Sequence, residues 1–331
     1  MKPEDRGLTV RSPSGSVRAP ALPAQPLGGG IGRGAEPPSE ETVGALLAAG
    51  AASLEEAGLP SPRRDAEWLL ADALGTDRLR LVLGLDRVVP RELAGRFREQ
   101  IARRRAHEPL QYILGYEEWR GLRLRTVPAA LIPRPETELL VEWAVELERA
   151  EGPWQVAVDV GAGTGAIACA LAAAAPRLKV VAVERSAGAL ALAAVNVAAL
   201  GLGRRVRLVA GDLFDPLGGL HGAVDLVVSN PPYIATAMLS QLPREVSDWE
   251  PREALDGGPD GMAVHRRLIA ESPRVLGPAG WLLMEMGERQ AGPLRASMEA
   301  NGFERVQVRR DLRGVERMIA GQVPAPEAWV R

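Results

Sequence analysis

The residues best suited to chemistry stand together in the segment Asn230-Pro231-Pro232-Tyr233. They follow an apolar run at 224–229 that has the pattern of a buried strand. Two successive prolines donate no backbone hydrogen bond, so the strand has to stop there in a stiff, extended turn. An amide oxygen and a proline carbonyl are both acceptors, and together they can bind the two hydrogens of a planar NH2 group while a tyrosine ring covers its plane. We therefore take these four residues as a candidate catalytic site that fixes a flat amino group.

A second candidate site is rich in glycine. The segment 159–166, Asp-Val-Gly-Ala-Gly-Thr-Gly-Ala, follows one apolar run and precedes a helical pattern. Its glycines let the backbone approach a ligand, and the start of a helix offers free N–H groups. Glu184 stands about 20 residues further on, where a carboxylate can bind the two hydroxyls of a ribose. The predicted cofactor contains a nucleoside, and NAD stays open because the string also satisfies G-x-G-x-x-A. The candidate ligands here are Gly161, Ala162, Gly163, Thr164, Gly165 and Glu184.

A third candidate position is Asp212, which follows the next apolar run together with Leu213 and Phe214. In folds of this kind the position lies beside an adenine ring. The Asp212 carboxylate can accept a hydrogen bond from the exocyclic amine, and Leu213 or Phe214 can cover the base. A place in the hydrophobic core is the alternative for both apolar residues.

Strand-length apolar runs alternate with helical patterns from residue 128 onward, and this alternation positions all three candidate sites. The runs lie at 156–160, 179–184, 206–210, 224–229 and 280–286, and two closing strands are expected at 305–311 and 317–320. The pattern predicts an α/β domain with a mainly parallel seven-stranded sheet covered by helices on both faces. Ligands bind at the carboxyl edge of such a sheet, where the candidate segments begin.

The preceding residues, 39–109, have the pattern of a small helical bundle. We expect Ser39 to cap the first helix, with Glu40 and Glu41 in its first turn. Ser61 before Pro62 predicts the start of the second helix, which Gly75 would end. Thr76 is expected to cap a short third helix, and Pro90 opens the fourth. That last helix is basic, which indicates either a solvated face or a docking surface for an acidic or RNA-associated partner; its arginines include Arg96, Arg98, Arg103, Arg104 and Arg105.

Two further segments connect these regions. Residues 110–127 combine Tyr112-Ile113-Leu114 with Trp119 and an alternating run at 122–125, which predicts a β-hairpin linker. In the segment 132–138, two prolines around Arg134 make a stiff strap. We expect Thr137 to cap the helix that follows, and Arg134 is a candidate partner for an acid such as Glu250.

Composition excludes several classes of function. The formal net charge of −2 argues against a general polyanion binder. Cys169 is the single cysteine, which rules out a disulfide within the chain and suits a reducing cytosol. The three histidines show no metal-ligand spacing, and no apolar stretch reaches the roughly 20 residues that span a bilayer. Residues 1–38, rich in Pro, Gly, Ser and Ala, predict a disordered tail.

Taken jointly, these motifs resemble those of S-adenosylmethionine-dependent methyltransferases that act on amino nitrogen. The glycine segment, Glu184, Asp212-Leu213 and Asn-Pro-Pro-Tyr stand on successive strand ends in the same order. Further motifs narrow the resemblance to the release-factor glutamine methyltransferase family, PrmC or HemK, over residues 39–323. They are Glu-Pro-Leu-Gln-Tyr-Ile-Leu-Gly at 108–115, Ile-Pro-Arg-Pro-Glu-Thr-Glu at 132–138, Glu250-Pro251 and Asp260-Gly261.

The resemblance implies a Rossmann-like class I methyltransferase domain at 128–331, a helical substrate-recognition domain at 39–109 and a linker at 110–127. It implies S-adenosyl-L-methionine as cofactor and methylation of the glutamine N5 in the GGQ motif of class 1 peptide chain release factors. It also implies a cytoplasmic monomer that binds neither membrane nor nucleic acid directly. By position, it assigns cofactor binding to Gly161, Ala162, Gly163, Thr164, Gly165, Glu184, Leu213 and Asn230, and glutamine binding to Asn230, Pro231, Pro232 and Tyr233.

This chain departs from the family pattern at two positions. Glu184 stands where many members have Asp, and Leu213 where some have an aromatic residue. The Asn-Pro-Pro-Tyr motif can bind the amino group of two other substrates in the same way, and both stay open as alternatives. They are a glutamine of a ribosomal protein and the N6 of adenine in a nucleic acid.

Overall fold

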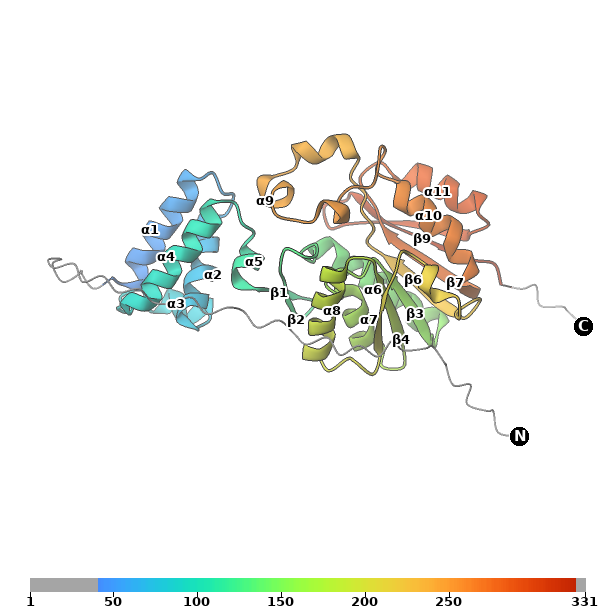
Figure 1. Ribbon diagram of the computed structural model, residues 1–331, viewed down its shortest axis with the longest axis horizontal. Helices are drawn as coiled ribbons and strands as arrows, with labels where there is room; N and C mark the ends of the chain where they lie inside the picture. Colours follow the sequence, from blue (N-terminus) through green and yellow to red (C-terminus); the bar gives the residue numbers. More distant parts are fainter. Residues whose placement is uncertain (1–40, 326–331) are drawn as a thin grey trace, which may run out of the picture. The chain divides into compact units, whose positions relative to one another are not determined.

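The computed structural model describes residues 41–325, and the predicted tail at 1–38 lies outside them. Within the described chain, five helices come first, of which the fifth is short; a short hairpin follows, and a sheet with its covering helices makes up the rest (Figure 1). In the same residues, no helix is both long and apolar enough to cross a membrane, and no cluster of possible metal ligands occurs.

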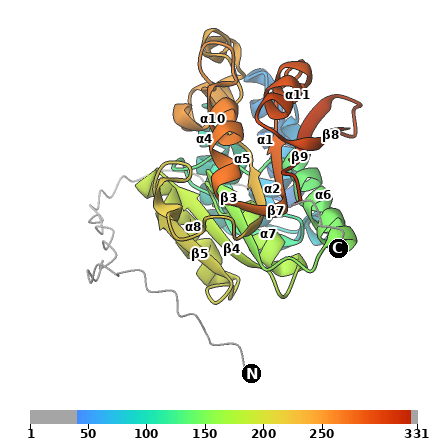
Figure 2. The ribbon, with the colours of Figure 1, turned by 90° about the vertical axis from the view of Figure 1, so that its right-hand side faces the viewer.

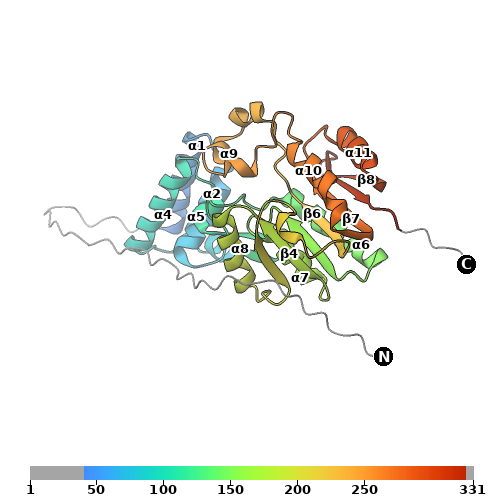
Figure 3. The same cartoon turned by 45° about the vertical axis from the view of Figure 1, so that its right-hand side comes forward.

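The first four helices pack into a bundle, as predicted. α1, α2 and α4 lie side by side (Figure 3), and their apolar faces share a core that contains Leu47, Leu69 and Phe97. The bounds of these helices are Val43–Glu56 for α1, Pro62–Leu74 for α2, Arg78–Leu83 for α3 and Arg91–Arg105 for α4.

The first helix begins later than predicted. Thr42 is its N-cap, and the Thr42 side chain accepts a hydrogen bond from the Ala45 N–H at 3.2 Å. Glu41 lies outside the helix because its carbonyl accepts from the Val89 N–H at 2.9 Å. The prediction of a cap at Ser39 is therefore wrong, since the helix begins after Thr42 and the Glu41 main chain is hydrogen-bonded to Val89 instead.

The cap predicted at Thr76 is also displaced by one residue. Asp77 caps α3, and its carboxylate accepts from the Arg80 N–H at 2.8 Å. The Thr76 N–H instead donates to Ala71 and closes the end of α2. Gly75 ends α2 in the left-handed region, as predicted.

The arginines of α4 are largely engaged within the chain. Arg96 pairs with Asp72, Arg98 with Glu41 and Arg103 with Glu108. The buried Arg104 contacts Asp65 at 2.8 Å and Glu245 at 2.7 Å. The exposed Arg96, Arg98 and Arg103 fit the interpretation of a solvated face, whereas the buried Arg104 does not. The docking surface stays a prediction.

The predicted hairpin is confirmed in its second half only. Strands β1 (Tyr116–Trp119) and β2 (Leu122–Arg125) pair antiparallel. Tyr112-Ile113-Leu114 is helical instead and belongs to α5 (Leu110–Leu114), which Gly115 ends with a φ of +81°. Tyr112 and Ile113 are both buried. A helical turn can place two successive side chains on one side, whereas a strand would point them to opposite faces, and this explains why the segment is helical.

The sheet has seven strands in the order β5-β4-β3-β6-β7-β9-β8. The first five pair parallel, and β9 and β8 pair antiparallel, so the predicted mainly parallel sheet is confirmed. The strands are β3 (Val156–Val160), β4 (Lys179–Glu184), β5 (Val206–Ala210), β6 (Val224–Ser229), β7 (Leu276–Glu285), β8 (Glu304–Arg310) and β9 (Glu316–Gln322).

Helices cover both faces of the sheet (Figure 2). Successive residues of a strand point to opposite faces of the sheet. Ala157 belongs to the core that contains α6 (Pro135–Glu151) and α7 (Ala166–Ala174). Val158 belongs to the core on the other face, with α10 (Ala263–Glu271) and α11 (Ala291–Ala300). The remaining helices are α8 (Ala187–Ala199) and the one-turn α9 (Arg244–Ser247). The chain order reverses between β3 and β6, and such a switch point leaves a crevice at the carboxyl edge.

Candidate active site

A cavity of about 230 Å³ lies at this carboxyl edge, and the predicted site residues largely line it. Its walls also include the strap before α6 and part of the segment that follows β6. Two predicted residues, Gly165 and Tyr233, are not among those that line it. The predicted residues on its wall are Gly161, Ala162, Gly163, Thr164, Glu184, Asp212, Leu213, Asn230, Pro231 and Pro232.

The cavity has two halves, which we call the glycine half and the amide half. The glycine half comprises the loop 161–164 with Glu184, Asp212 and Leu213. The amide half comprises 230–232 with the side chains that support Asn230.

In the glycine half, the loop after β3 presents bare backbone. Gly161 and Gly163 have φ values of +76° and +55°, which side chains with a Cβ rarely adopt. A Cβ placed on either residue would meet no atom within 4 Å, so the space above both is open. This loop can let a ligand approach the main chain closely.

Glu184 closes the glycine half from the end of β4. One carboxylate oxygen accepts from the Gly163 N–H at 2.9 Å, and the other accepts from the Ser186 N–H at 2.8 Å. The side chain is buried and fixed at both oxygens, each of which keeps acceptor capacity toward the cavity. This geometry suits a pair of hydroxyl donors.

Gly165 has a packing role, and its predicted ligand contact stays a prediction. Its φ is +79°, and a Cβ there would lie 3.3 Å from the Ala193 Cβ. The glycine thus allows α7 to start close to α8.

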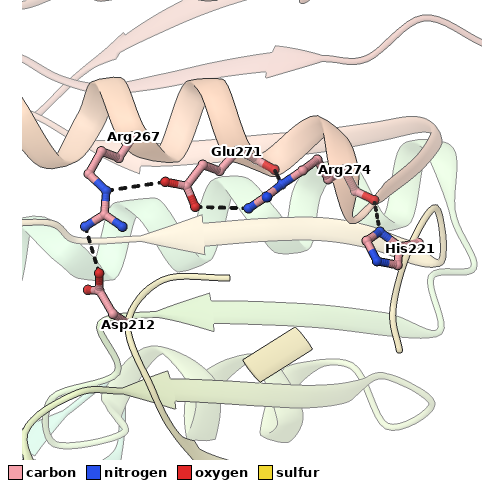
Figure 4. A network of polar contacts seen from close by, with 5 residues as sticks. All are labelled: Asp212, His221, Arg267, Glu271 and Arg274. Carbon is pink, nitrogen blue, oxygen red and sulfur yellow. Dashed lines mark hydrogen bonds and ion pairs between the residues drawn. The ribbon is translucent and has the colours of Figure 1, made fainter. Parts of the chain in front are cut away.

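Asp212 and Leu213 follow β5 and both line the cavity, whereas Phe214 does not. Leu213 and Phe214 both belong to the hydrophobic core. Asp212 is bound by an ion pair that sequence reasoning missed: its carboxylate accepts from Arg267 Nη1 at 2.8 Å. Figure 4 shows this pair at one end of a chain of contacts that runs along α10 through Glu271 to Arg274.

The amide half is organised by a chain of three side chains. Asn230 Nδ2 donates to Thr137 Oγ1 at 3.0 Å, and the Thr137 hydroxyl donates to Glu285 Oε2 at 2.6 Å. Thr137 therefore does not cap α6, which starts at Pro135 after Arg134. With Nδ2 engaged, Oδ1 is the acceptor that Asn230 has left for a ligand in the cavity.

Tyr233 contributes to the same support. Its hydroxyl donates to Glu285 Oε1 at 3.2 Å, and its carbonyl accepts from Gln290 Nε2 at 3.0 Å. The hydroxyl thus ties the side chain to the end of β7, and the cover of a bound amide by the Tyr233 ring stays a prediction. Burial raises the pKa of Glu285 to about 7, against the lowering effect of hydrogen bonds from Thr137 and Tyr233.

Sequence reasoning missed Glu285 and Gln290. The sequence does carry a signal for Glu285, because this carboxylate stands inside the apolar run Trp281-Leu-Leu-Met-Glu-Met286. A carboxyl group buried with such a strand needs a hydrogen-bond partner. Gln290 carries no comparable signal, since nothing local marks it.

The strap at 132–138 borders the cavity and is held by the ion pair that was hypothesised between Arg134 and Glu250. Arg134 Nη2 lies 2.5 Å from Glu250 Oε1, and the Glu250 side chain is almost fully buried. Burial raises the pKa of Glu250, and the Arg134 guanidinium opposes this rise.

Comparison with known proteins agrees with this arrangement. The family model described as "PrmC N-terminal domain" matches residues 45–115, and the "Methyltransferase small domain" matches residues 136–242. Among solved structures, the catalytic domain of hMettl16 in complex with a MAT2A 3'UTR hairpin shares the fold, with a TM-score of 0.53 and 19% identity over 69% of this chain and 84% of that one.

Sequence relatives are considerably closer. The release factor glutamine methyltransferase of Geobacter sulfurreducens is 44% identical over 272 residues, which are 82% of this chain and 93% of the relative. The protein of the same name from Cereibacter sphaeroides is 40% identical over 279 residues, which are 84% of this chain and 98% of the relative. With matches of this extent over the bundle and the catalytic sheet alike, the chain belongs to the release factor glutamine methyltransferase family.

Proposed function

We propose that this protein transfers a methyl group from S-adenosylmethionine to the side-chain amide nitrogen of a glutamine in class 1 peptide chain release factors. The single observation that carries the proposal is the fixed amide of Asn230, whose Oδ1 is free to face the cavity that also holds Glu184. An acceptor in that place matches the N–H groups of a carboxamide.

The residues present fit the proposed cofactor. Glu184 offers two anchored carboxylate oxygens for ribose hydroxyls, and the open backbone at Gly161 and Gly163 leaves room beside them. Leu213 would cover an adenine, and Asp212 would accept from its amine. When bound, S-adenosylmethionine supplies a methyl group on a positively charged sulfur, which departs as a neutral thioether.

The chain's own residues act by positioning. Asn230 Oδ1 and the Pro231 carbonyl would each accept one N–H of the glutamine amide and thereby aim its nitrogen. Those bonds strengthen as positive charge develops on the nitrogen, so they stabilise the transition state more than the ground state. Orientation of this kind supplies roughly 7–11 kcal/mol in well-aligned systems. The arrangement requires no strong base beside the nitrogen before the new bond forms, because the nitrogen becomes acidic only as that bond forms and then releases one of its two protons to water.

The helical bundle at 39–109 is proposed to recognise release-factor surface away from the glutamine, with 110–127 as linker and 128–331 as the methyltransferase domain. Arg104 contacts Glu245 in the segment that follows Asn-Pro-Pro-Tyr, which supports a role for the bundle beside the substrate. Action on release factors places the protein with translation termination in the cytoplasm.

The test is mass spectrometry after incubation of the enzyme and methyl donor with an intact release factor. A gain of one methyl group on the GGQ glutamine supports the proposal. Parallel arms with a GGQ peptide, a ribosomal protein, DNA and RNA separate the alternative substrates. Methylation confined to one of the last three would refute the release-factor assignment.

A further inference from the structure

The amide half contains a chain of hydrogen bonds, which we call the relay, and the proposed chemistry uses only its first member, Asn230, directly. It runs from Asn230 at the end of β6 through Thr137 on α6 to Glu285 at the end of β7. Thr137 is 4% exposed and Glu285 is 1% exposed, so water does not compete for their hydrogen bonds. The direction of each bond is therefore set by what the partners can donate or accept.

An ionised Glu285 forces one direction on this chain. A carboxylate only accepts, so the Thr137 hydroxyl has to donate its single proton to it. The Thr137 oxygen then has only lone pairs left, and Asn230 has to turn its NH2 toward Thr137. As a result, the acceptor Oδ1 of Asn230 faces the cavity.

A neutral Glu285 removes this constraint. The protonated carboxyl can donate to the Thr137 oxygen, and the Thr137 proton is then free to reach Asn230 Oδ1. The Asn230 amide can turn over and present its NH2 to the cavity. A donor in that place cannot accept an N–H of a substrate amide.

We propose that Glu285 is a positioning residue whose ionised carboxylate, acting through Thr137, keeps the acceptor oxygen of Asn230 turned toward the substrate amide. This inference rests on the proposed function of the site. Glu285 touches neither substrate nor methyl donor in this scheme.

The surroundings of Glu285 set the pH at which the relay changes direction. The Tyr233 hydroxyl donates to it, Arg317 on β9 favours its ionised form, and Glu136 on α6 opposes ionisation. His265 on α10 bonds only the Glu285 main-chain oxygen, and burial lowers the His265 pKa to about 4, so this ring stays neutral. Because burial raises the pKa of Glu285 to about 7, turnover should rise as the pH passes upward through that value.

The kinetic test measures methylation of an intact release factor at pH 8 by the parent and by variants of the relay. We expect Glu285→Gln and Thr137→Val each to lower kcat at least 10-fold, and the double variant to be no slower than the slower single one. Thr137→Ser keeps the hydroxyl and should retain most of the parent rate. Calorimetry should show unchanged affinity for the methyl donor, which also confirms folding.

Glu151→Gln is the matched control. Glu151 accepts from Trp281 Nε1 at 2.9 Å, and it does not line the cavity, so the same chemical change there should leave kcat at the parent value. Parent rates in both relay variants would overturn the inference, and so would losses that multiply in the double variant.

A second readout does not depend on activity. The side-chain NH2 resonances of Asn230, assigned by their disappearance in Asn230→Ala, should titrate near pH 7 in the parent and not in Glu285→Gln. Resonances that stay constant with pH in the parent would refute the relay. Failure of the parent to methylate any release factor would refute the proposed function instead, and the titration would still decide the inference.

Discussion

The glycine half and the amide half of the cavity are built from different kinds of contact. In the glycine half, Glu184 is fixed by main-chain N–H groups of Gly163 and Ser186, which lie 21 and 2 residues away, within one β-α-β unit. In the amide half, Asn230 is fixed by Thr137, and Thr137 by Glu285, which lie 93 and 148 residues away. A site made from backbone tolerates many substitutions around it, whereas a relay of side chains depends on every member.

The largest effect is expected at Asn230, because it is the member of the relay that would touch the substrate. Asn230→Ala should lower turnover about 100- to 1,000-fold, as for loss of one transition-state hydrogen bond. Affinity for the methyl donor should change little, and steady-state kinetics with calorimetry would measure both. Asn301→Ala removes an exposed asparagine that bonds Ser297 and serves as the control. An Asn230→Ala enzyme with the parent rate would contradict the proposed role.

Stability of the amide half should depend on pH in a defined direction. The pKa of Glu285 is raised from 4.5 to about 7, so the unfolded chain ionises first as the pH rises. The folded state therefore loses free energy between about pH 4.5 and 7 relative to Glu285→Gln, by on the order of 2–3 kcal/mol. Urea unfolding of both proteins at pH 5 and pH 8 measures the change. A constant difference between the two proteins across that range would show that Glu285 ionises as freely in the folded chain as in the unfolded one.

In the glycine half, Glu184→Ala should weaken binding of the methyl donor about 10- to 100-fold, because hydrogen bonds to a charged group contribute ~1.5–3 kcal/mol. Turnover at saturating donor should fall much less, since Glu184 does not support Asn230. Titration calorimetry and kinetics at several donor concentrations separate the two effects. Unchanged affinity would remove Glu184 from the site.

The smallest effect is expected for Arg267→Ala. Its ion pair with Asp212 is exposed, with side chains 47% and 39% accessible, and such pairs contribute up to about 1 kcal/mol. Donor affinity should fall less than about 5-fold, and 1 M salt should reduce the difference further. A larger loss would mean that Arg267 itself binds the ligand.

Much of the glycine half was predictable from the sequence, because its signals are local. Glycines at a strand-to-helix turn and an acid at the next strand end follow from the geometry of one β-α-β unit. The strands were also predicted closely, since buried parallel strands are continuous apolar runs. The predicted caps at Ser39 and Thr76 were wrong because neighbouring residues offered competing hydrogen bonds that sequence patterns do not rank.

The sequence by itself determined that a stiff corner at 230–233 follows a buried strand and exposes an amide. Chemistry of the residue types and the limits on proline backbones suffice for that conclusion. Only the tertiary structure decided which way the amide is turned, that the Tyr233 hydroxyl bonds Glu285, and that Gly165 lets α7 start close to α8. Those outcomes depend on contacts between β6, α6 and β7 across long stretches of chain, and the folded sheet alone brings these elements together.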